Sequence, residues 1–232
     1  VAAGISYDKA RVLEADRTRD DPGLPAGSSD AAIWQPEGQG EYHPSLSSRT
    51  RFPTLFDRYS TRFGMAVPNP DLKSERALNT ELGYSGELGP VTLNTALFYS
   101  KVKDVIQSVP TGALDGEGRQ ITQSRNVGDG VYKGFEVSAD WQLADSMVLV
   151  ANDTYMHRML NDPLWADYRP TQTPRHNAFL RLDRQATPVL TVSPSVQVSS
   201  SHLSESAIQP EDPAAIAYTR MGGFALANLD SA

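Results

Sequence analysis

The alternation of apolar and polar residues over positions 134–143 most restricts what this chain can fold into. Successive side chains of a β-strand point to opposite faces, so a period of two residues predicts a strand with one apolar and one polar face. The apolar positions are Phe135, Val137, Ala139, Trp141 and Leu143. The polar positions between them are Glu136, Ser138, Asp140 and Gln142. The pattern therefore predicts a strand that separates an apolar from a polar environment.

The same period recurs along most of the chain and predicts further strands. They are expected at residues 1–13, 78–84, 92–100, 147–157, 177–183, 190–199 and 222–230. Weaker patterns predict strands at 31–42 and 46–52, on either side of a turn at His43-Pro44-Ser45. Because Pro194 cannot donate a hydrogen bond to a neighbouring strand, we also expect a β-bulge within 190–199.

Hydropathy excludes membrane helices but not membrane strands. The chain is 39% hydrophobic with a mean hydropathy of -0.40. No stretch supplies the roughly 18 consecutive apolar residues of a membrane helix, whereas a membrane strand needs only about 9 to 11 residues with every second one apolar. A membrane β-barrel is therefore compatible with this composition.

The connections between the expected strands alternate in length. Short turns are expected at 86–90, 144–146 and 184–188, and long polar loops at 52–75, 108–118, 160–174 and 201–220. A membrane barrel with short periplasmic turns and long extracellular loops has this rhythm. A soluble β-sandwich that binds a ligand is the alternative, although its strands are usually shorter. In a sandwich, a second sheet would cover the face that carries Phe135, Val137 and Trp141.

Charge and cysteine content exclude several other classes. The net charge is -7 and the pI is near 5.1, which argues against binding nucleic acid through a general basic surface. Because the chain has no cysteine, it has no disulfide, zinc-thiolate site or thiol nucleophile. The first residues lack a charged segment followed by an apolar one, so we interpret the sequence as an internal fragment whose export signal lies elsewhere.

A series of short motifs resembles one family. In order along the chain, these are Arg51-Phe52-Pro53-Thr54-Leu55, Asn69-Pro70-Asp71-Leu72-Lys73-Ser74-Glu75, Glu81-Leu82-Gly83, Phe98-Tyr99, Asp104-Val105-Ile106, Asn126-Val127-Gly128, Gly134-Phe135-Glu136, Pro174-Arg175-His176-Asn177 and Gly223-Phe224-Ala225-Leu226-Ala227-Asn228-Leu229. In their order and spacing they look like the C-terminal half of the barrel of a TonB-dependent outer-membrane receptor. Two positions depart from the residues usual in that family. Ser74 stands where proline is usual, and Gly130 stands where a small residue such as alanine is common.

The resemblance implies an all-β fold, an antiparallel up-and-down transmembrane β-barrel of which residues 1–232 supply about 10 of about 22 strands. It places the plug domain and TonB box before Val1 and the last strands after Ala232. The open sheet edges of such a fragment would favour self-association. The implied partners are the TonB energy-transducing complex, reached through the missing N-terminal part, and outer-membrane lipid, with no nucleic acid.

The function implied is that of a receptor in the bacterial outer membrane. Such a receptor takes up a scarce, bulky nutrient by active transport energised through TonB. A ferric siderophore is the first expectation, and haem, cobalamin and oligosaccharide remain open. No cofactor is implied. An outer-membrane barrel enzyme is a further alternative, but the chain has no G-x-S-x-G motif and no triad can be assembled from its spacings.

No catalytic, metal or ligand-binding residue can be assigned from the sequence. Polar residues expected to face the barrel lumen, mostly as a solvated wall, are Glu136, Ser138, Asp140, Gln142, Arg181 and Asp183. Aromatic residues expected in interfacial girdles are Tyr84, Tyr99, Trp141 and Tyr155. The segment Asn69–Glu75 is expected to stiffen a turn, and Glu75 to hold backbone near the start of a strand.

The remaining ionisable residues suggest no site. The four histidines lack His-x-His or His-x3-His spacing, so we expect surface or loop positions for His43, His157, His176 and His202. Solvated loop charge is the expectation for Asp16, Asp20, Asp21, Glu205, Glu211 and Asp212.

Overall fold

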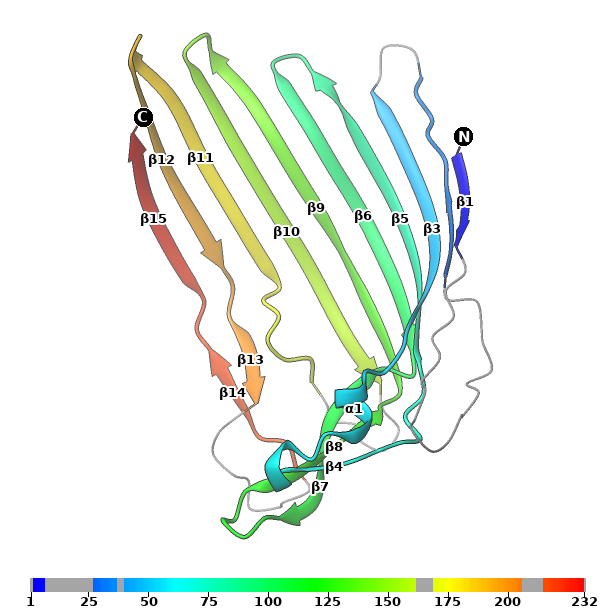
Figure 1. Cartoon of the computed structure of the whole chain (residues 1–232). Helices are drawn as coiled ribbons and strands as arrows, with labels where there is room; N and C mark the ends of the chain where they lie inside the picture. Colours follow the sequence, from blue (N-terminus) through cyan, green and yellow to red (C-terminus); the bar gives the residue numbers. More distant parts are fainter. Residues whose placement is uncertain (1, 7–26, 37–39, 162–168, 206–214, 232) are drawn as a thin grey trace.

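Ten strands of the computed structural model form one antiparallel sheet in the order β1-β2-β3-β5-β6-β9-β10-β11-β12-β15 (Figure 1). The structure describes residues 2–6, 27–36, 40–161, 169–205 and 215–231. The strands are β1 Ala2–Ser6, β2 Gly27–Ala31, β3 Glu41–Arg51, β5 Glu75–Leu88, β6 Val91–Lys103, β9 Asp129–Ala144, β10 Met147–Asn161, β11 His176–Thr187, β12 Leu190–Ser199 and β15 Phe224–Ser231. Each strand pairs with its neighbours in the series, so the sheet is an open part of an up-and-down barrel, as predicted.

Shorter elements gather at one end of this sheet. They are the helix α1 Leu55–Tyr59, the 3-10 helix η1 Arg62–Gly64, and the strands β4 Ala66–Val67, β7 Ile106–Leu114, β8 Gln120–Asn126, β13 His202–Glu205 and β14 Tyr218–Met221. β4, β8 and β7 form a small three-stranded sheet, and β13 pairs with β14. Figure 1 shows α1 and the three-stranded sheet together at the end opposite the short turns. The sequence predicted loops, not strands, for most of these segments.

The two faces of the ten-stranded sheet differ as the alternation predicted. On one, which we call the inner face, Val102 packs with Val105, Val109 and Val127 of the loop after β6, and all four are at most 3% exposed. The opposite, outer face carries apolar side chains that are 37–59% exposed: Leu78, Leu82, Leu97, Tyr99, Trp141, Leu143, Leu180, Val196 and Val198. No second sheet covers the outer face within the described residues, which removes the main reason for a sandwich.

The turns between the long strands are tighter than predicted. β5 continues through Gly86 to Leu88, so only Gly89 and Pro90 connect it to β6. Gly89 has a φ of +61°, the conformation that the first central residue of a type II′ hairpin requires. Two residues also join β9 to β10 and β11 to β12, because β11 extends to Thr187. The connections after β3, β6, β10 and β12 lie at the other end, which confirms the predicted rhythm for these strands (Figure 1). The connection of residues 32–40, which joins β2 to β3 at the turn end, is longer than the two-residue turns.

The predicted turn at His43-Pro44-Ser45 is wrong, because β3 runs straight through it. The Pro44 carbonyl accepts a hydrogen bond from Ala32 N at 3.0 Å, just beyond the end of β2. The proline nitrogen points the same way, so its missing N–H falls where the pairing with β2 stops. The strand predicted at 31–42 is also wrong: β2 ends at Ala31, and only an isolated bridge joins Trp34 to Tyr42.

The bulge predicted at Pro194 is also wrong. Pro194 pairs with Leu229 in an unbroken register between β12 and β15. On the β11 side the pairing offset is the same before and after the proline, and the irregularity lies near Gln185 instead. Pro194 thus removes a donor without inserting an extra residue. Of the strand predicted at 1–13, residues 7–13 lie outside the described part of the chain. None of the described helices is long and apolar enough to cross a membrane.

Candidate functional site

The first element of the loop end after β3 is the helix α1, whose N-terminus is capped by Thr54. Thr54 and Asp57 form a reciprocal capping box around α1, with Asp57 N donating to Thr54 Oγ1 at 3.1 Å and Thr54 N donating to Asp57 Oδ2 at 2.9 Å. Arg58 of the same helix is buried and donates from Nη2 to the Leu72 carbonyl at 3.0 Å. The helix is thereby tied to the segment around Leu72.

The segment Asn69–Glu75 has the structural role that the sequence predicted. Asn69 Nδ2 donates to the Ser124 carbonyl at 2.8 Å, which ties this segment to β8. The Glu75 carboxylate accepts a hydrogen bond from Ile106 N at 3.0 Å, at the first residue of β7. A carboxylate at the start of one strand therefore positions the start of another.

Asn126 completes the connection from the β8 side. Its Nδ2 donates to the Lys73 carbonyl at 3.0 Å and to the Asp104 carbonyl at 2.8 Å, while its Oδ1 accepts from Lys73 N at 2.8 Å. These bonds join segments about 22 and 53 residues apart in the sequence. With the valine core beneath them, they make the loop end a fixed scaffold on which side chains can be positioned.

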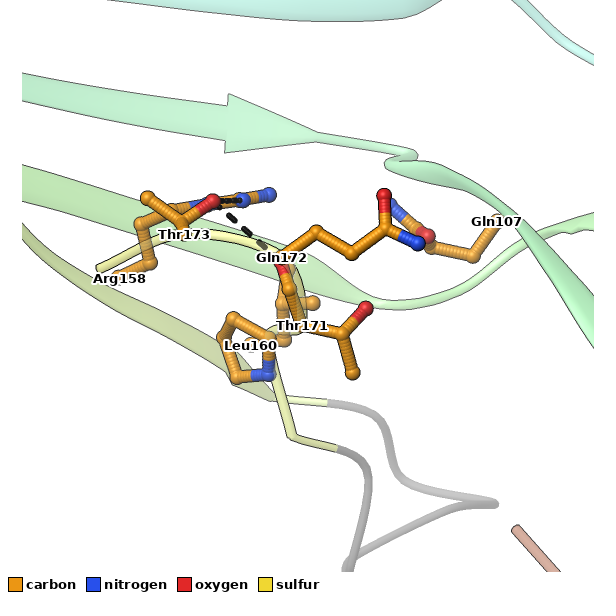
Figure 2. A pocket seen from close by; sticks show the side chains of 7 residues that line it. Gln107, Arg158, Leu160, Thr171, Gln172 and Thr173 are labelled. Atoms are coloured by element: carbon orange, nitrogen blue, oxygen red, sulfur yellow. Dashed lines mark hydrogen bonds between the residues drawn. The ribbon is translucent and has the colours of Figure 1, made fainter. Parts of the chain in front are cut away.

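A polar hollow of about 300 Å³ opens beside this scaffold (Figure 2). Arg158, on the inner face of β10, donates from Nη1 to Thr173 Oγ1 at 2.7 Å, and its guanidinium lies 4.9 Å from the centre of the Tyr132 ring. The other lining residues are Gln107, Leu160, Pro170, Thr171, Gln172 and Thr173. A guanidinium, two amides and two hydroxyls converge here, so the hollow suits an oxygen-rich or anionic ligand.

A second hollow, of about 310 Å³, lies along the wall of the sheet. Its inner-face lining includes Glu81, Glu136 and His43, with the hydroxyl of Ser85 lying 3.2 Å from His43 Nε2. Gly83 leaves room for the His43 ring, since a Cβ at Gly83 would lie 2.7 Å from that ring. This hollow is carboxylate-rich and differs in character from the hollow around Arg158.

The residues predicted to face the lumen lie on the inner face. Glu136 pairs with Ala96 and Thr154 in the row that also holds Gly83, and Ser138, Asp140 and Gln142 follow it on the same side of β9. On β11, Arg181 and Asp183 form an ion pair, with Nη2 and Oδ2 3.0 Å apart. The structure brings Glu136 and Ser138 to the wall hollow and leaves the other predicted lumen residues outside both hollows.

The four predicted girdle residues lie on the outer face. Tyr155 lies between Phe135 and His176, with ring centres 5.6 and 4.6 Å away, and Tyr84 contacts Tyr42 at 5.0 Å. Tyr99 and Trp141 are 47% and 45% exposed. Their place at a membrane interface stays a prediction.

These aromatic residues mark out the height of an apolar band. Exposed apolar residues begin at the short turns, with Leu88 and Leu143. At the other end, Tyr99 lies nine residues after Pro90 and Tyr155 nine after Ser146. At ~3.4 Å per residue and a strand tilt of ~40°, nine residues span about 23 Å along the barrel axis. This agrees with the apolar band of about 25 Å in outer-membrane barrels.

The remaining ionisable candidates are dispersed. His43 lies on the inner face of β3, His157 on β10, His176 at the start of β11 and His202 on β13. Glu205 ends β13, whereas Asp16, Asp20, Asp21, Glu211 and Asp212 lie outside the described residues. Sequence reasoning missed the Arg158 hollow. Its one local signal was an arginine close to the loop end of β10.

Comparisons with known proteins agree with this architecture. A family model described as "TonB dependent receptor-like, beta-barrel" matches residues 1–231. No curated protein matches the chain at a significant level. Among solved structures, the copper transporter OprC superimposes with a TM-score of 0.70 and 16% identity, over 88% of this chain and 30% of that one.

Two siderophore receptors have a similar barrel. A mutant ferric enterobactin receptor, PfeA from Pseudomonas aeruginosa, in complex with enterobactin, gives a TM-score of 0.67 at 21% identity, over 88% of this chain and 32% of that one. PirA from Acinetobacter baumannii gives 0.65 at 16%, over 88% and 34%. The chain thus spans about a third of the length of these proteins, and at such identities the likeness concerns the fold.

Proposed function

The chain belongs to the TonB-dependent receptor family as part of its β-barrel, and from this premise we propose that it is a portion of an outer-membrane receptor that imports a scarce nutrient. The observation that carries the proposal is the apolar band of about 23 Å on the outer face, opposite a polar inner face. Antiparallel pairing satisfies the backbone groups between neighbouring strands, as lipid requires, apart from the donor that Pro194 lacks.

A ferric siderophore is the cargo we propose. Structural neighbours with similar barrels are a ferric enterobactin receptor and a siderophore receptor, which supports this cargo class. The hollow around Arg158 adds local support, because its guanidinium and amide donors suit the oxygen atoms of a ferric complex. In this proposal the plug domain and the TonB contact lie in parts of the receptor beyond residues 1–232.

The alternatives have less support. A soluble sandwich would need a second sheet on the outer face, where the described residues place none. A barrel enzyme is disfavoured because the family and the structural neighbours are transport receptors.

The first test is assembly of the complete receptor in the outer membrane. We expect the unboiled protein to migrate faster than the boiled one on an SDS gel and to fractionate with outer membranes. A soluble protein whose migration is unaffected by boiling would overturn the barrel proposal.

The cargo is tested by uptake of radioactive iron as ferric enterobactin in cells with and without TonB. We expect uptake of ferric enterobactin that depends on TonB. Haem and cobalamin are tested in parallel as the competing cargo classes. Replacing Arg158 with Gln should weaken cargo binding by about 10-fold or more, because a charged donor is lost. Arg49→Gln, which removes a cation from another position on the inner face, is the matched control. Uptake of haem or cobalamin without uptake of ferric enterobactin would refute the siderophore assignment. The proposal that the protein is an import receptor would still stand.

A further inference from the structure

Four cations lie on three neighbouring strands of the outer face, near the loop end. Arg76 lies on β5, Lys101 and Lys103 on β6, and Lys133 on β9, and all four side chains are exposed. Arg76 is directly opposite Lys103, and Lys101 is diagonal to Lys133, because Lys133 pairs with Tyr99. We call these four residues the cationic row.

Within the described residues, no ion pair neutralises the cationic row. The nearest carboxylate by register is that of Asp129, the first residue of β9. Asp129 precedes Gly130, the partner of Val102, so the register continued by one residue places it beside Lys103, as one acid against four cations. The group therefore keeps an excess of positive charge. Like charges directly opposite each other on adjacent strands are destabilising, as for Arg76 and Lys103. An anion from outside the chain would relieve this repulsion.

The height of the cationic row indicates what that anion is. Lys133 pairs with Tyr99 at the end of the apolar band, and Lys101 and Lys103 follow two and four residues later on β6. At the same rise and tilt, four residues span about 10 Å, so the row lies within about 10 Å of the band. The headgroup layer of a bilayer extends about 5–8 Å beyond each side of the hydrocarbon core.

We propose that the cationic row binds the phosphate groups of an anionic lipid in the leaflet that surrounds the loop end. The proposal rests on the proposed function, since it requires the outer face to lie in a membrane. Long lysine side chains reach from the apolar band to the headgroups, and the Arg76 guanidinium can bind a phosphate with two parallel hydrogen bonds. The polar inner face, which carries the hollows, takes no part in this contact.

The test uses the complete receptor in detergent micelles, titrated with diphosphoryl lipid A, with phosphatidylcholine as the zwitterionic control. Native mass spectrometry counts the bound lipid. We expect the double variant Lys101→Gln, Lys133→Gln to bind lipid A about 25-fold more weakly, at about fivefold for each cation. The matched control, Arg49→Gln with Lys73→Gln, removes the same charge from the inner face and a loop. It should bind like the unaltered receptor.

Two results would overturn the lipid site: equal loss in both double variants, or undiminished binding by Lys101→Gln, Lys133→Gln. Each variant is first checked for heat-dependent gel migration, which reports barrel assembly independently of lipid A. If the unaltered receptor assembles as a barrel and imports its cargo but the row variant binds lipid A normally, only this inference fails. If the unaltered receptor is not a barrel, the proposed function fails and takes the lipid site with it.

Discussion

The Glu75 carboxylate connects the ten-stranded sheet to the loop that covers its inner face. It accepts the Ile106 N–H at 3.0 Å and lies 3.5 Å from Arg51 Nη1. Replacing Glu75 with Ala should destabilise this loop by about 1–3 kcal/mol, because Ile106, which is only 8% exposed, is left with an unsatisfied donor. Limited proteolysis of residues 104–128, together with thermal unfolding, measures the effect.

The control for this prediction is Glu75→Gln, whose amide oxygen can still accept from Ile106. We expect it to protect the loop more than Glu75→Ala does, while losing the attraction to Arg51. If the alanine variant resists protease as well as the unaltered receptor, the carboxylate does not hold the loop.

Asp115 makes the β7–β8 hairpin sensitive to pH. Its pKa lies below the ordinary value of 3.8, first because Arg119 N donates to it at 2.8 Å, and also because the Arg119 side chain donates at 2.7 Å. A lowered pKa in the folded state means that the ionised carboxylate stabilises the turn above the ordinary pKa. This contribution is lost as the pH falls below 3.8 through the folded-state pKa.

We therefore expect the Arg119 amide to lose its protection from hydrogen exchange in acid. Asp115→Asn is the control, because it cannot titrate and should show a weaker hairpin with little pH dependence. The same acid profile in both proteins would mean that another group controls the turn.

These two side chains show how far local reasoning extends. The sequence predicted that Glu75 would hold backbone near a strand start, and the structure confirms this. It did not identify Ile106 as the partner, because the two residues are 31 positions apart and meet only through folding. The hollow around Arg158 was missed for the same reason, since its lining comes from β7, β10 and the segment before β11.

Among the strands, β10 carries an acidic residue on its outer face. Asp153 pairs with Val137 and Ala178, and its Oδ1 lies 3.9 Å from His176 Nδ1. If the outer face lies in lipid as proposed, Asp153→Leu should raise the stability of the barrel by about 1 kcal/mol. The temperature at which the unboiled gel form converts to the boiled form measures this change.

The control is Asp140→Leu, which makes the same chemical change on the inner face. It should give no gain, because that face is polar and wet. Stabilisation by both variants, or by neither, would contradict the assignment of the outer face to lipid.

Strand prediction succeeded where one strand carried its own signal and failed where a neighbour decided the outcome. Residues 134–143 have unlike faces, and β9 contains them all. Pro44 signals a turn when considered alone, yet it lies inside β3 because β2 ends beside it. Pro194 was tolerated without a bulge in a continuous register with β15.

The open ends of the sheet lead to a prediction about the whole molecule. Within the described residues, β1 and β15 each pair with one strand of the sheet, so one edge of each is unpaired. Unpaired edges favour pairing with other chains. We expect the isolated chain of residues 1–232 to self-associate in detergent, as light scattering would show. The complete receptor, with its edges paired, is the control, and a monomeric isolated chain at high concentration would contradict the expectation.

By itself, the sequence determined the strand period, the polarity of the two faces and the rhythm of short turns and long loops. These features depend on residues close together in the chain, because a side chain two positions away already lies on the same face. Only the tertiary structure decided which residues meet across strands. The pairing of Arg76 with Lys103 and the diagonal contact of Lys101 with Lys133 follow from strand register. Register is set jointly by neighbouring strands and their turns, so no single stretch of sequence contains it.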